Sequence, residues 1–364
     1  MCNRLAVGSW RLAGDPPAPT VGWAALLATA YCILQTVLDS FLRREIDVGS
    51  FPGVSYAIGT ADGLVREHAL GHAVAVPLRI ATTTDTIFDC ASITKPLITG
   101  SLVLQAVAEG RIALEDEYRG YTFRELLTHT SGLRAWLPTF TYPSVLEAIE
   151  RDGPAAPRGT RVIYSDLNFF LLYFALNEVF GDYRTAARER IFAPLGLRDA
   201  WFDPPATLRP RIAATEWGQR FEAKTFSVAF AGFRQGLMWG EPNDGNSFHG
   251  GGTLGNAGLF ATARDVFRIA QGFARGELVP RELVEEATRA QAEDRGLAWQ
   301  IGGPGLSPRS FGHTGFTGTS VWLDEGGIFV LLTNRVHPCA APIAMQRIRG
   351  VFHELSRVRP GIST

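Results

Sequence analysis

Lysine is almost absent from this chain of 364 residues: Lys95 and Lys224 are the only two, although lysine and arginine together number 35. Arginine stays protonated at any ordinary pH, whereas a lysine can be tuned to release its proton. Each remaining lysine therefore raises the question of what arginine could not do at that position. Chance retention is enough to explain Lys224. Lys95 lies three residues after Ser92, and this spacing gives it a chemical context.

Other absences exclude whole classes of protein. The four cysteines, at positions 2, 32, 90 and 339, form no CxxC or Cys/His spacing, which argues against a disulfide scaffold and a zinc ribbon. No run of five basic residues occurs and the net charge is −1, so we expect no nucleic-acid partner. The chain also has neither the HExxH motif of zinc peptidases nor the GxSxG motif of α/β-hydrolases.

The N-terminal region allows two interpretations. Residues 21–38 are mostly apolar, but polar residues break the run, and a membrane-spanning helix needs ~20 apolar residues. Helical spacing of apolar positions continues to Ile46, which favours an amphipathic helix docked on the protein and a cytoplasmic location. The alternative is an export or membrane-anchoring segment, with Arg4 and Arg11 before it. We expect residues 1–20 to be a loose extension.

Strand patterns are found at both ends of the chain and helical patterns in the middle. β-Rich runs at 54–59 and 64–71 flank a glycine-containing turn and predict a hairpin. A helical pattern covers 93–109, and strand-like runs return over 297–334. A last helix is predicted over 342–355.

The economical arrangement of these elements is an α+β fold. A central antiparallel sheet, covered by the terminal helices in an α/β sandwich, would carry an inserted all-helical domain. We predict that residues 21–110 and 291–358 form the sheet domain and that residues 111–290 form the mainly helical domain.

Ser92 and Lys95 have the spacing of a nucleophile and a base. They stand in the segment Asp89–Pro96, at a predicted strand-to-helix junction. If Ser92 opens the helix, the Lys95 amine lies one turn on and can take the proton of the hydroxyl. The helix dipole and free backbone N–H groups, including that of Ser92, would then face a reacting carbonyl oxygen. The alternative is a serine N-cap followed by a surface lysine.

Two further motifs favour the catalytic interpretation. Tyr164-Ser165-Asp166 begins an apolar helix, and His313-Thr314-Gly315 lies on a candidate strand. In this order, Ser92-x-x-Lys95 and these two motifs resemble the serine β-lactamase and penicillin-binding-protein superfamily, above all its class C-like branch of β-lactamases, DD-carboxypeptidases, D-aminopeptidases and esterases. The strings TTTDTIFDCASITKPL, FRELLTHTSGL and GGTLGNAGLFATARDVFRIA are similar to that branch as well. The resemblance covers about residues 40–355 and implies a β-lactamase/transpeptidase-like fold.

The resemblance implies a role for each motif. Ser92 would attack a carbonyl and form an acyl-enzyme, which water then hydrolyses. Lys95 and Tyr164 would share the proton transfers, with Tyr164 accepting the Ser92 proton and returning it to the leaving group. His313-Thr314-Gly315 would line the cleft, and the N–H groups of Ser92 and Phe316 would form the oxyanion hole. No metal or cofactor is implied.

Two departures from the usual motifs bear on the substrate. Asp166 stands where many relatives have asparagine, and its carboxylate would hold Lys95 protonated and shift the base role towards Tyr164. His313 stands where many relatives have lysine, so the cleft would carry less fixed positive charge. We therefore expect a serine hydrolase of the esterase, D-aminopeptidase or DD-carboxypeptidase type rather than a β-lactamase in the strict sense.

Other polar groups have less specific patterns. His129-Thr130-Ser131-Gly132 ends a predicted helix, and we interpret it as a structural cap. Asn243, Asp244 and His249, before the glycines at 250–252, form a polar loop that either lines the cleft or makes a turn.

Two other functions remain as alternatives. Asp166 would suit an inactive homologue that binds peptidoglycan-like peptides or acts as a scaffold. A metal hydrolase would need ligands from His129, His249, His313 and Asp244, which lack the spacing of known metal motifs. For the leading hypothesis we expect a monomer that acts on a small ester or peptide-like substrate, with membrane association only through residues 21–38.

Overall fold

The computed structural model describes residues 36–153, 155–341 and 343–357. The predicted extension at 1–20 and most of the apolar segment 21–38 lie outside these residues. The described part of that segment runs into a helix at residues 36–47.

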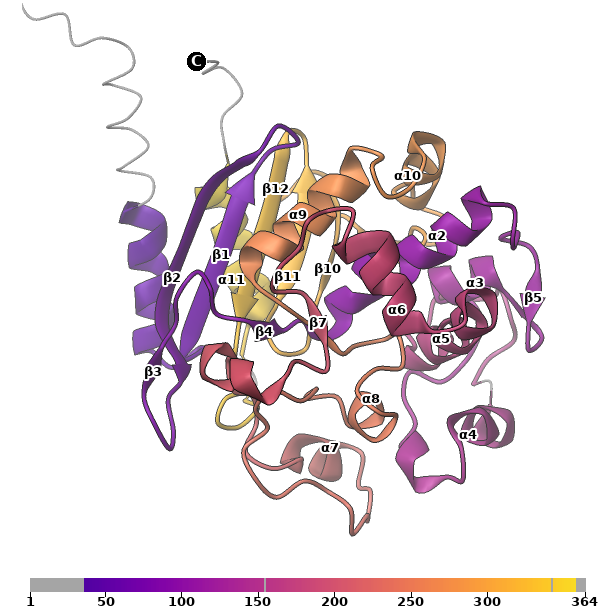
Figure 1. The fold of residues 1–364 in the computed structure, drawn as a ribbon, viewed down its shortest axis with the longest axis horizontal. Helices are drawn as coiled ribbons and strands as arrows, with labels where there is room; N and C mark the ends of the chain where they lie inside the picture. Colours follow the sequence, from indigo (N-terminus) through magenta and orange to yellow (C-terminus); the bar gives the residue numbers. More distant parts are fainter. Residues whose placement is uncertain (1–35, 154, 342, 358–364) are drawn as a thin grey trace, which may run out of the picture.

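The centre of the fold is a seven-stranded sheet with the strand order β3-β2-β1-β12-β11-β10-β9 (Figure 1). Every pair of neighbours is antiparallel. Strands from the two ends of the chain meet where β1 pairs with β12, so the sheet needs both ends of the chain to form. This confirms the predicted α+β class with a central antiparallel sheet. The strands are β1 (Gly53–Gly59), β2 (Leu64–Val74), β3 (Ile80–Ala81), β9 (Gln300–Ile301), β10 (Phe311–Thr314), β11 (Ser320–Asp324) and β12 (Gly327–Thr333).

Alternating side chains give this sheet two different apolar faces. On β1, Tyr56 and Ile58 pack against the helix at 36–47 and against α11 (Met345–Ser356), whereas Ala57 belongs to the core on the opposite face. That opposite face is covered by α9 (Ala263–Ala274), which contacts β1 and β12. Figure 1 shows α9 crossing one face of the sheet and α11 lying behind it.

Most of the remaining helices lie on the side of the sheet next to β10, with α7 below the sheet and α10 near its top in the view of Figure 1. α5 is their apolar centre and packs on α2 and α3. They are α2 (Ser101–Ala108), α3 (Phe123–Thr128), α4 (Val145–Asp152), α5 (Asp166–Phe180), α6 (Tyr183–Ala187), α7 (Arg220–Thr225), α8 (Gly245–His249) and α10 (Arg281–Ala287), with shorter helical turns η1 (Ala91–Ile93), η2 (Lys95–Gly100), η3 (Thr139–Thr141), η4 (Arg188–Phe192) and η5 (Ala206–Arg211).

Small strands join the region that the sequence pattern presents as helical to the predicted strand before Ser92. β4 (Phe88–Asp89) pairs with β8 (Leu259–Ala261), and β8 pairs with β7 (Trp201–Phe202). β5 (Glu117–Tyr118) and β6 (Tyr121–Thr122) form a separate hairpin. Strands of two or three residues are too short to show a period in the sequence. The division of the chain at residues 110 and 290 stays a prediction.

One helical stretch of the described chain is long and apolar enough to cross a membrane, Ala91–Ala108. It is 83% buried inside the protein, as expected for a core helix of a globular fold. It begins at Ser92's own turn, so the candidate catalytic residues are attached to one of the most deeply packed elements of the molecule.

Candidate active site

Ser92 stands at the start of a helix that follows a short buried strand. β4 ends at Asp89, and the backbone turns at Ala91, whose φ of +47° is left-handed and unusual for a residue with a side chain. The Asp89 carboxylate accepts a hydrogen bond from the Ala91 N–H at 2.9 Å and so supports this conformation. Ser92 itself is partly exposed, between buried Ala91 and Ile93. The Ser92 hydroxyl is therefore accessible to a substrate, while the buried residues on either side fix the backbone of Ser92.

The Lys95 side chain is fully buried and is directed at Ser92. Its amine donates to Ser92 Oγ at 3.0 Å and to the carbonyl oxygen of Asn256 at 3.1 Å. It also forms an ion pair with Asp166 Oδ1 at 2.6 Å. An ammonium group has three donors, and each has an oxygen acceptor here. The Ser-x-x-Lys spacing thus brings the two side chains together as expected.

Two opposing effects set the pKa of Lys95. Burial lowers the pKa of an amine, but the Asp166 carboxylate and the Tyr164 hydroxyl outweigh burial and raise the pKa of Lys95 above its ordinary value. The amine is therefore protonated at neutral pH. In that state it donates hydrogen bonds and cannot itself take the proton of Ser92.

The start of α5 places Tyr164 and Asp166. The Asp166 N–H donates to the carbonyl oxygen of Ala135 at 3.0 Å, and Ser165 Oγ donates to that of Arg134 at 2.6 Å. These bonds fix the first turn of the helix, where the positive end of the helix dipole favours a carboxylate. The Lys95 ammonium lies 5.0 Å from the centre of the Tyr164 ring. The phenol and the cation are therefore neighbours across the cleft.

Two buried histidines flank the Tyr164 ring. The His313 and His129 rings lie 5.7 Å and 4.7 Å from it, centre to centre. Burial lowers the pKa of each histidine well below its usual value, and the charges of Lys95 and Arg295 act in the same direction. Both rings are therefore neutral at pH 7, as the sequence predicts for His313.

The two neutral histidines are opposite tautomers. His313 Nδ1 lies 2.8 Å from the Thr314 carbonyl oxygen, which can only accept, so Nδ1 carries the proton. His129 Nδ1 accepts from the Ser165 N–H at 3.0 Å, so its proton is on Nε2. Each Nε2 is buried with no hydrogen-bond partner among the described residues. The wall around Tyr164 therefore has one free donor and one free acceptor but no histidine charge.

Phe316 lies in a turn that is tied to the strand before Ser92. Gly318 N–H donates to Gly315 O at 3.1 Å and closes the turn. The hydroxyls of Thr317 and Thr319 donate to the carbonyl oxygens of Asp89 and Cys90, each at 2.8 Å. Phe316 N–H donates to no acceptor among the described residues. A free N–H on a turn that is hydrogen-bonded to the residues before Ser92 is a candidate oxyanion donor.

Three site residues were missed by sequence reasoning. Asn256 holds Lys95 through its backbone carbonyl, which its side-chain type does not reveal. Arg295 lies 5.4 Å from the centre of the Tyr164 ring, and its buried Nε lies 3.2 Å from Asp294 Oδ1, with which it forms an ion pair. Nothing distinguishes Arg295 in sequence from the many other arginines. Asp89 was quoted only as part of the motif, yet it supports the turn before Ser92.

The other predicted polar groups have structural partners. His129 caps α3 in a left-handed conformation, and Gly132 packs so closely on Ala156 that a Cβ would lie 2.1 Å from its carbonyl oxygen. Asp244 caps α8, and His249 packs among aromatic rings that include Phe140. Within the described residues, no three His, Cys, Asp or Glu side chains gather in a way that could hold a metal ion.

Residues 38–350 match the sequence model of a protein family described as Beta-lactamase. A protein of Escherichia coli strain K12, named "Putative D-alanyl-D-alanine carboxypeptidase", is 29% identical, and the alignment covers 84% of this chain and 83% of that protein. A Salmonella typhi protein of the same name is 27% identical, with 84% of each chain covered.

Solved structures show the same fold. The unliganded simvastatin synthase LovD of Aspergillus terreus superposes with a TM-score of 0.68 at 17% identity, covering 90% of this chain and 99% of that one. An octameric penicillin-binding protein homologue of Pyrococcus abyssi has a TM-score of 0.65 at 21% identity, covering 86% of this chain and 76% of that one. The β-lactamase/transpeptidase-like fold that the motifs imply is thereby confirmed.

Proposed function

This chain belongs to the beta-lactamase family, a family of serine hydrolases within the serine β-lactamase and penicillin-binding-protein superfamily, and we propose that it hydrolyses its substrates through an acyl-enzyme at Ser92. One observation carries the proposal most directly. The Lys95 ammonium is buried in contact with both Ser92 Oγ and the Asp166 carboxylate. Burying an ammonium group between a hydroxyl and a carboxylate lowers the stability of the fold. A purely structural role for Lys95 would not require that cost.

Acylation follows from this geometry. Because Lys95 is protonated, it donates to Ser92 Oγ and leaves the hydroxyl proton for Tyr164, which takes it as a phenolate oxygen and becomes a neutral phenol. As that proton moves, Oγ bonds to the substrate carbonyl carbon and the carbonyl electrons move to its oxygen. The N–H groups of Ser92 and Phe316 stabilise the oxyanion. When the intermediate collapses, the leaving group departs with the proton from Tyr164, and the acyl group stays on Ser92.

Deacylation repeats these steps with water. A water molecule gives its proton to Tyr164 and its oxygen bonds to the acyl carbon. The ester bond to Ser92 Oγ then breaks, and Tyr164 returns the proton to Oγ. Lys95 stays protonated throughout and stabilises negative charge on either oxygen. Lys95 is thus an electrostatic partner, and Tyr164 is the acid and base.

The substrate class we propose is a small ester or a D-amino-acid amide, as for an esterase, a D-aminopeptidase or a DD-carboxypeptidase. The names of the Escherichia coli and Salmonella relatives favour the carboxypeptidase type. Arg295 supports it as well, because its guanidinium, although paired with Asp294 at 3.2 Å, brings a cationic group beside Tyr164 where His313 is neutral. A leaving group that ends in a carboxylate would be attracted to that side of the cleft.

A fluorophosphonate probe tests the nucleophile, because it labels only activated serines. We expect the wild type to be labelled and Ser92→Ala to be unlabelled. Ser144→Ala, which changes the exposed N-cap serine of α4, should be labelled as the wild type is. Equal labelling of wild type and Ser92→Ala would reject Ser92. Substrate binding without labelling or turnover would instead favour the inactive homologue.

A further inference from the structure

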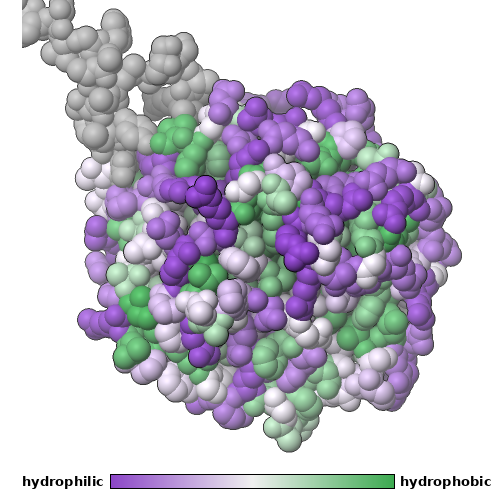
Figure 2. Space-filling view, viewed as in Figure 1, coloured by the Kyte–Doolittle hydropathy of each residue, from purple (hydrophilic) through white to green (hydrophobic). Residues whose placement is uncertain are grey.

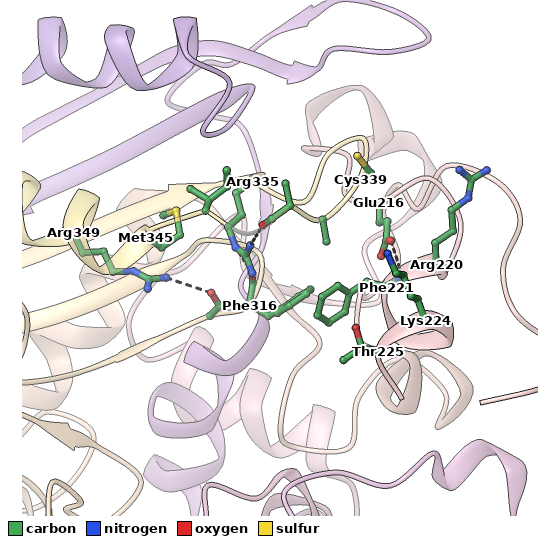
Figure 3. Close-up of a pocket in the computed structure, with 14 residues that line it drawn as sticks. Glu216, Arg220, Phe221, Lys224, Thr225, Phe316, Arg335, Cys339, Met345 and Arg349 are labelled. Carbon is green, nitrogen blue, oxygen red and sulfur yellow. Dashed lines mark hydrogen bonds between the residues drawn. The ribbon is translucent and has the colours of Figure 1, made fainter. Parts of the chain in front are cut away.

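A pocket of about 680 Å³ opens beside the turn that carries Phe316 (Figure 3). Its walls come from three segments that are far apart in sequence: α7, the turn at Gly315–Gly318, and the segment from Arg335 to Arg349 that leads from β12 into α11. Gly315 and Phe316 belong both to this pocket and to the turn that is tied to the Ser92 segment. The pocket therefore continues from the proposed oxyanion position.

Four cationic side chains line this pocket against one carboxyl group, that of Glu216. Arg220 and Lys224 are exposed and lie one helical turn apart on α7, so they share one face. Arg335 and Arg349 come from the opposite wall. Lys224, for which the sequence offers only chance retention, thus lies in a cationic group.

These four cations have no ion-pair partner among the described residues, although arginines elsewhere in the molecule commonly form one. Arg335 donates to the carbonyl oxygens of Phe316 at 2.7 Å and Ala341 at 3.1 Å. Arg349 donates to the carbonyl oxygen of Thr319 at 3.0 Å. Its buried Nε has no hydrogen-bond partner among the residues that the structure describes. Backbone carbonyls do not neutralise a charge, so the pocket has a positive potential that would attract an anion.

The base of the pocket is apolar. The rings of Phe221 and Phe316 lie 4.7 Å apart, and the Arg335 guanidinium lies over the Phe316 ring at 4.8 Å. Ile343 and Met345 add aliphatic surface. Figure 3 shows the two phenylalanine rings together below the cationic side chains. A ligand with an apolar stem and a charged end would match this lining.

The position of the pocket relative to Tyr164 indicates which part of a substrate would enter it. In the proposed reaction the leaving group takes its proton from Tyr164, so it lies beside Tyr164, His313 and Arg295. The pocket is lined by Gly315 and Phe316, which bears the proposed oxyanion donor, whereas Tyr164, His313 and Arg295 do not line it. The acyl group, which lies across the carbonyl from the leaving group, is the part that can extend towards it.

We propose that this pocket binds a carboxylate at the far end of the substrate's acyl group, with Arg220 and Lys224 as the groups that recognise it. The preferred acyl donors would then be monoesters or monoamides of dicarboxylic acids, or peptides with a side-chain carboxylate on the acyl side. This inference rests on the proposed function, because it assumes that an acyl group is attached to Ser92.

Two chromogenic esters of equal length test the proposal: the mono-4-nitrophenyl ester of adipic acid and the 4-nitrophenyl ester of adipic acid monoamide. The first ends in a carboxylate and the second in a neutral amide. We expect wild-type kcat/KM to be about 10- to 100-fold higher for the acid than for the amide at low ionic strength. The preference should shrink at ~0.5 M salt, because exposed charges are screened.

The variants Arg220→Met and Lys224→Met should each reduce this preference, and the double variant should bring the ratio close to one. Lys224→Arg keeps the charge and should keep most of the preference. Arg281→Met removes an exposed arginine on α10 that forms no ion pair among the described residues, and it should leave the ratio unchanged. Because Arg220 and Lys224 are exposed, these substitutions should not unfold the protein.

The outcomes separate this proposal from the proposed function. Ser92-dependent turnover of the neutral ester with a wild-type ratio of one would overturn the carboxylate pocket and leave the acyl-enzyme mechanism intact. Absence of Ser92-dependent turnover of both esters would overturn both. Calorimetric titration with adipic acid monoamide adds a third outcome: binding that needs Arg220 and Lys224, without any acyl preference, would identify a site for a free anion and would also overturn the assignment to the acyl group.

Discussion

The ammonium group of Lys95 shows why lysine persists in a chain that otherwise uses arginine. It touches three oxygen atoms that come from three different segments, those of Ser92, Asp166 and Asn256. A compact ammonium can direct its donors to three such positions, whereas a planar guanidinium is larger and directs its donors into one plane. The lysine is therefore explained by the shape of its site, and its raised pKa means that it acts as a cation rather than as a base.

Asp166→Asn tests whether the cationic state of Lys95 is needed. Asparagine keeps the shape of the side chain but removes the carboxylate that raises the pKa of Lys95, so this pKa should fall. Lys95 would then lose its proton at lower pH, and the decline of kcat/KM at alkaline pH should begin earlier than in the wild type. A pH profile of kcat/KM for a chromogenic ester measures this shift. Identical alkaline limbs in both proteins would contradict the role of Lys95 as a required cation.

The titration of Asp89 predicts a pH dependence of the free energy of unfolding. It is fully buried, and burial raises the pKa of its carboxyl group from 3.8 to about 6. Between these values the folded protein holds a proton that the unfolded chain has lost, so the free energy of unfolding should fall as pH rises from about 4 to about 6. The two-unit shift corresponds to about 3 kcal/mol.

Asp89→Asn removes this titration, so the pH dependence should differ between the two proteins. The wild type should lose about 3 kcal/mol relative to the variant between pH 4 and pH 7, measured by urea denaturation at several pH values. Asparagine cannot accept both of the hydrogen bonds that Asp89 accepts from the Ala91 and Asn243 N–H groups, so the variant should also be less stable at pH 4. Parallel pH curves would show that Asp89 is not the group that titrates.

At the scale of elements, the site depends on the contact between the turn at Gly315–Gly318 and the segment that precedes Ser92. Hydrogen bonds from Thr317 and Thr319 fix the turn at Gly315–Gly318 to the last residues before Ser92. Gly315 allows this contact, because a Cβ there would lie 2.0 Å from Thr319 Oγ1 and 2.7 Å from the Cys90 carbonyl oxygen. The position of the Phe316 N–H group therefore depends on the absence of a side chain at residue 315.

Gly315→Ala should separate the turn from the Ser92 segment. The added methyl group meets backbone that cannot move freely, so we expect a loss of about 1–3 kcal/mol in unfolding free energy and a fall in kcat larger than any change in KM. Gly63→Ala is the matched control, since a Cβ at that glycine, in the turn between β1 and β2, meets nothing within 4 Å. If both variants kept wild-type kcat, the turn at residue 315 would not position the oxyanion donor.

The elements also show how far sequence patterns reach. The long strands and helices were predicted because their apolar residues repeat over many positions, as in β1, β12 and α5. The strand before Ser92, β4, was predicted as part of the strand-to-helix junction, whereas β7 and β8 beside it were not, because two or three residues carry no period. Ser92 and Lys95 were predicted from their short-range spacing, and Tyr164 from the resemblance of its motif to a known family. Arg295 was not, because its place beside Tyr164 follows from the tertiary fold alone.

At the scale of the molecule, the two faces of the sheet carry different tasks. One face, with α9 and the helix that begins at Ala91, belongs to the core that supports the Ser92 site. The other face is closed by the helix at 36–47 and by α11, whose side chains form a separate apolar core. Hydrophobic and hydrophilic side chains are interspersed over the outer surface that Figure 2 shows. Substitutions in the core behind the helix at 36–47 should therefore change stability without changing catalysis.

Leu42→Ala tests this separation. Leu42 is fully buried in the core between the helix at 36–47 and the sheet, so the cavity left by alanine should cost about 2–5 kcal/mol in unfolding free energy. Val37→Ala is the matched control on the same helix: its side chain is 45% exposed, and its loss should change stability by less than about 0.5 kcal/mol. Because the helix packs on the sheet face away from Ser92, kcat and KM of folded Leu42→Ala should equal those of the wild type. Urea denaturation and ester kinetics on the same samples measure both properties, and a large fall in kcat with Leu42→Ala would show that the two faces of the sheet are coupled.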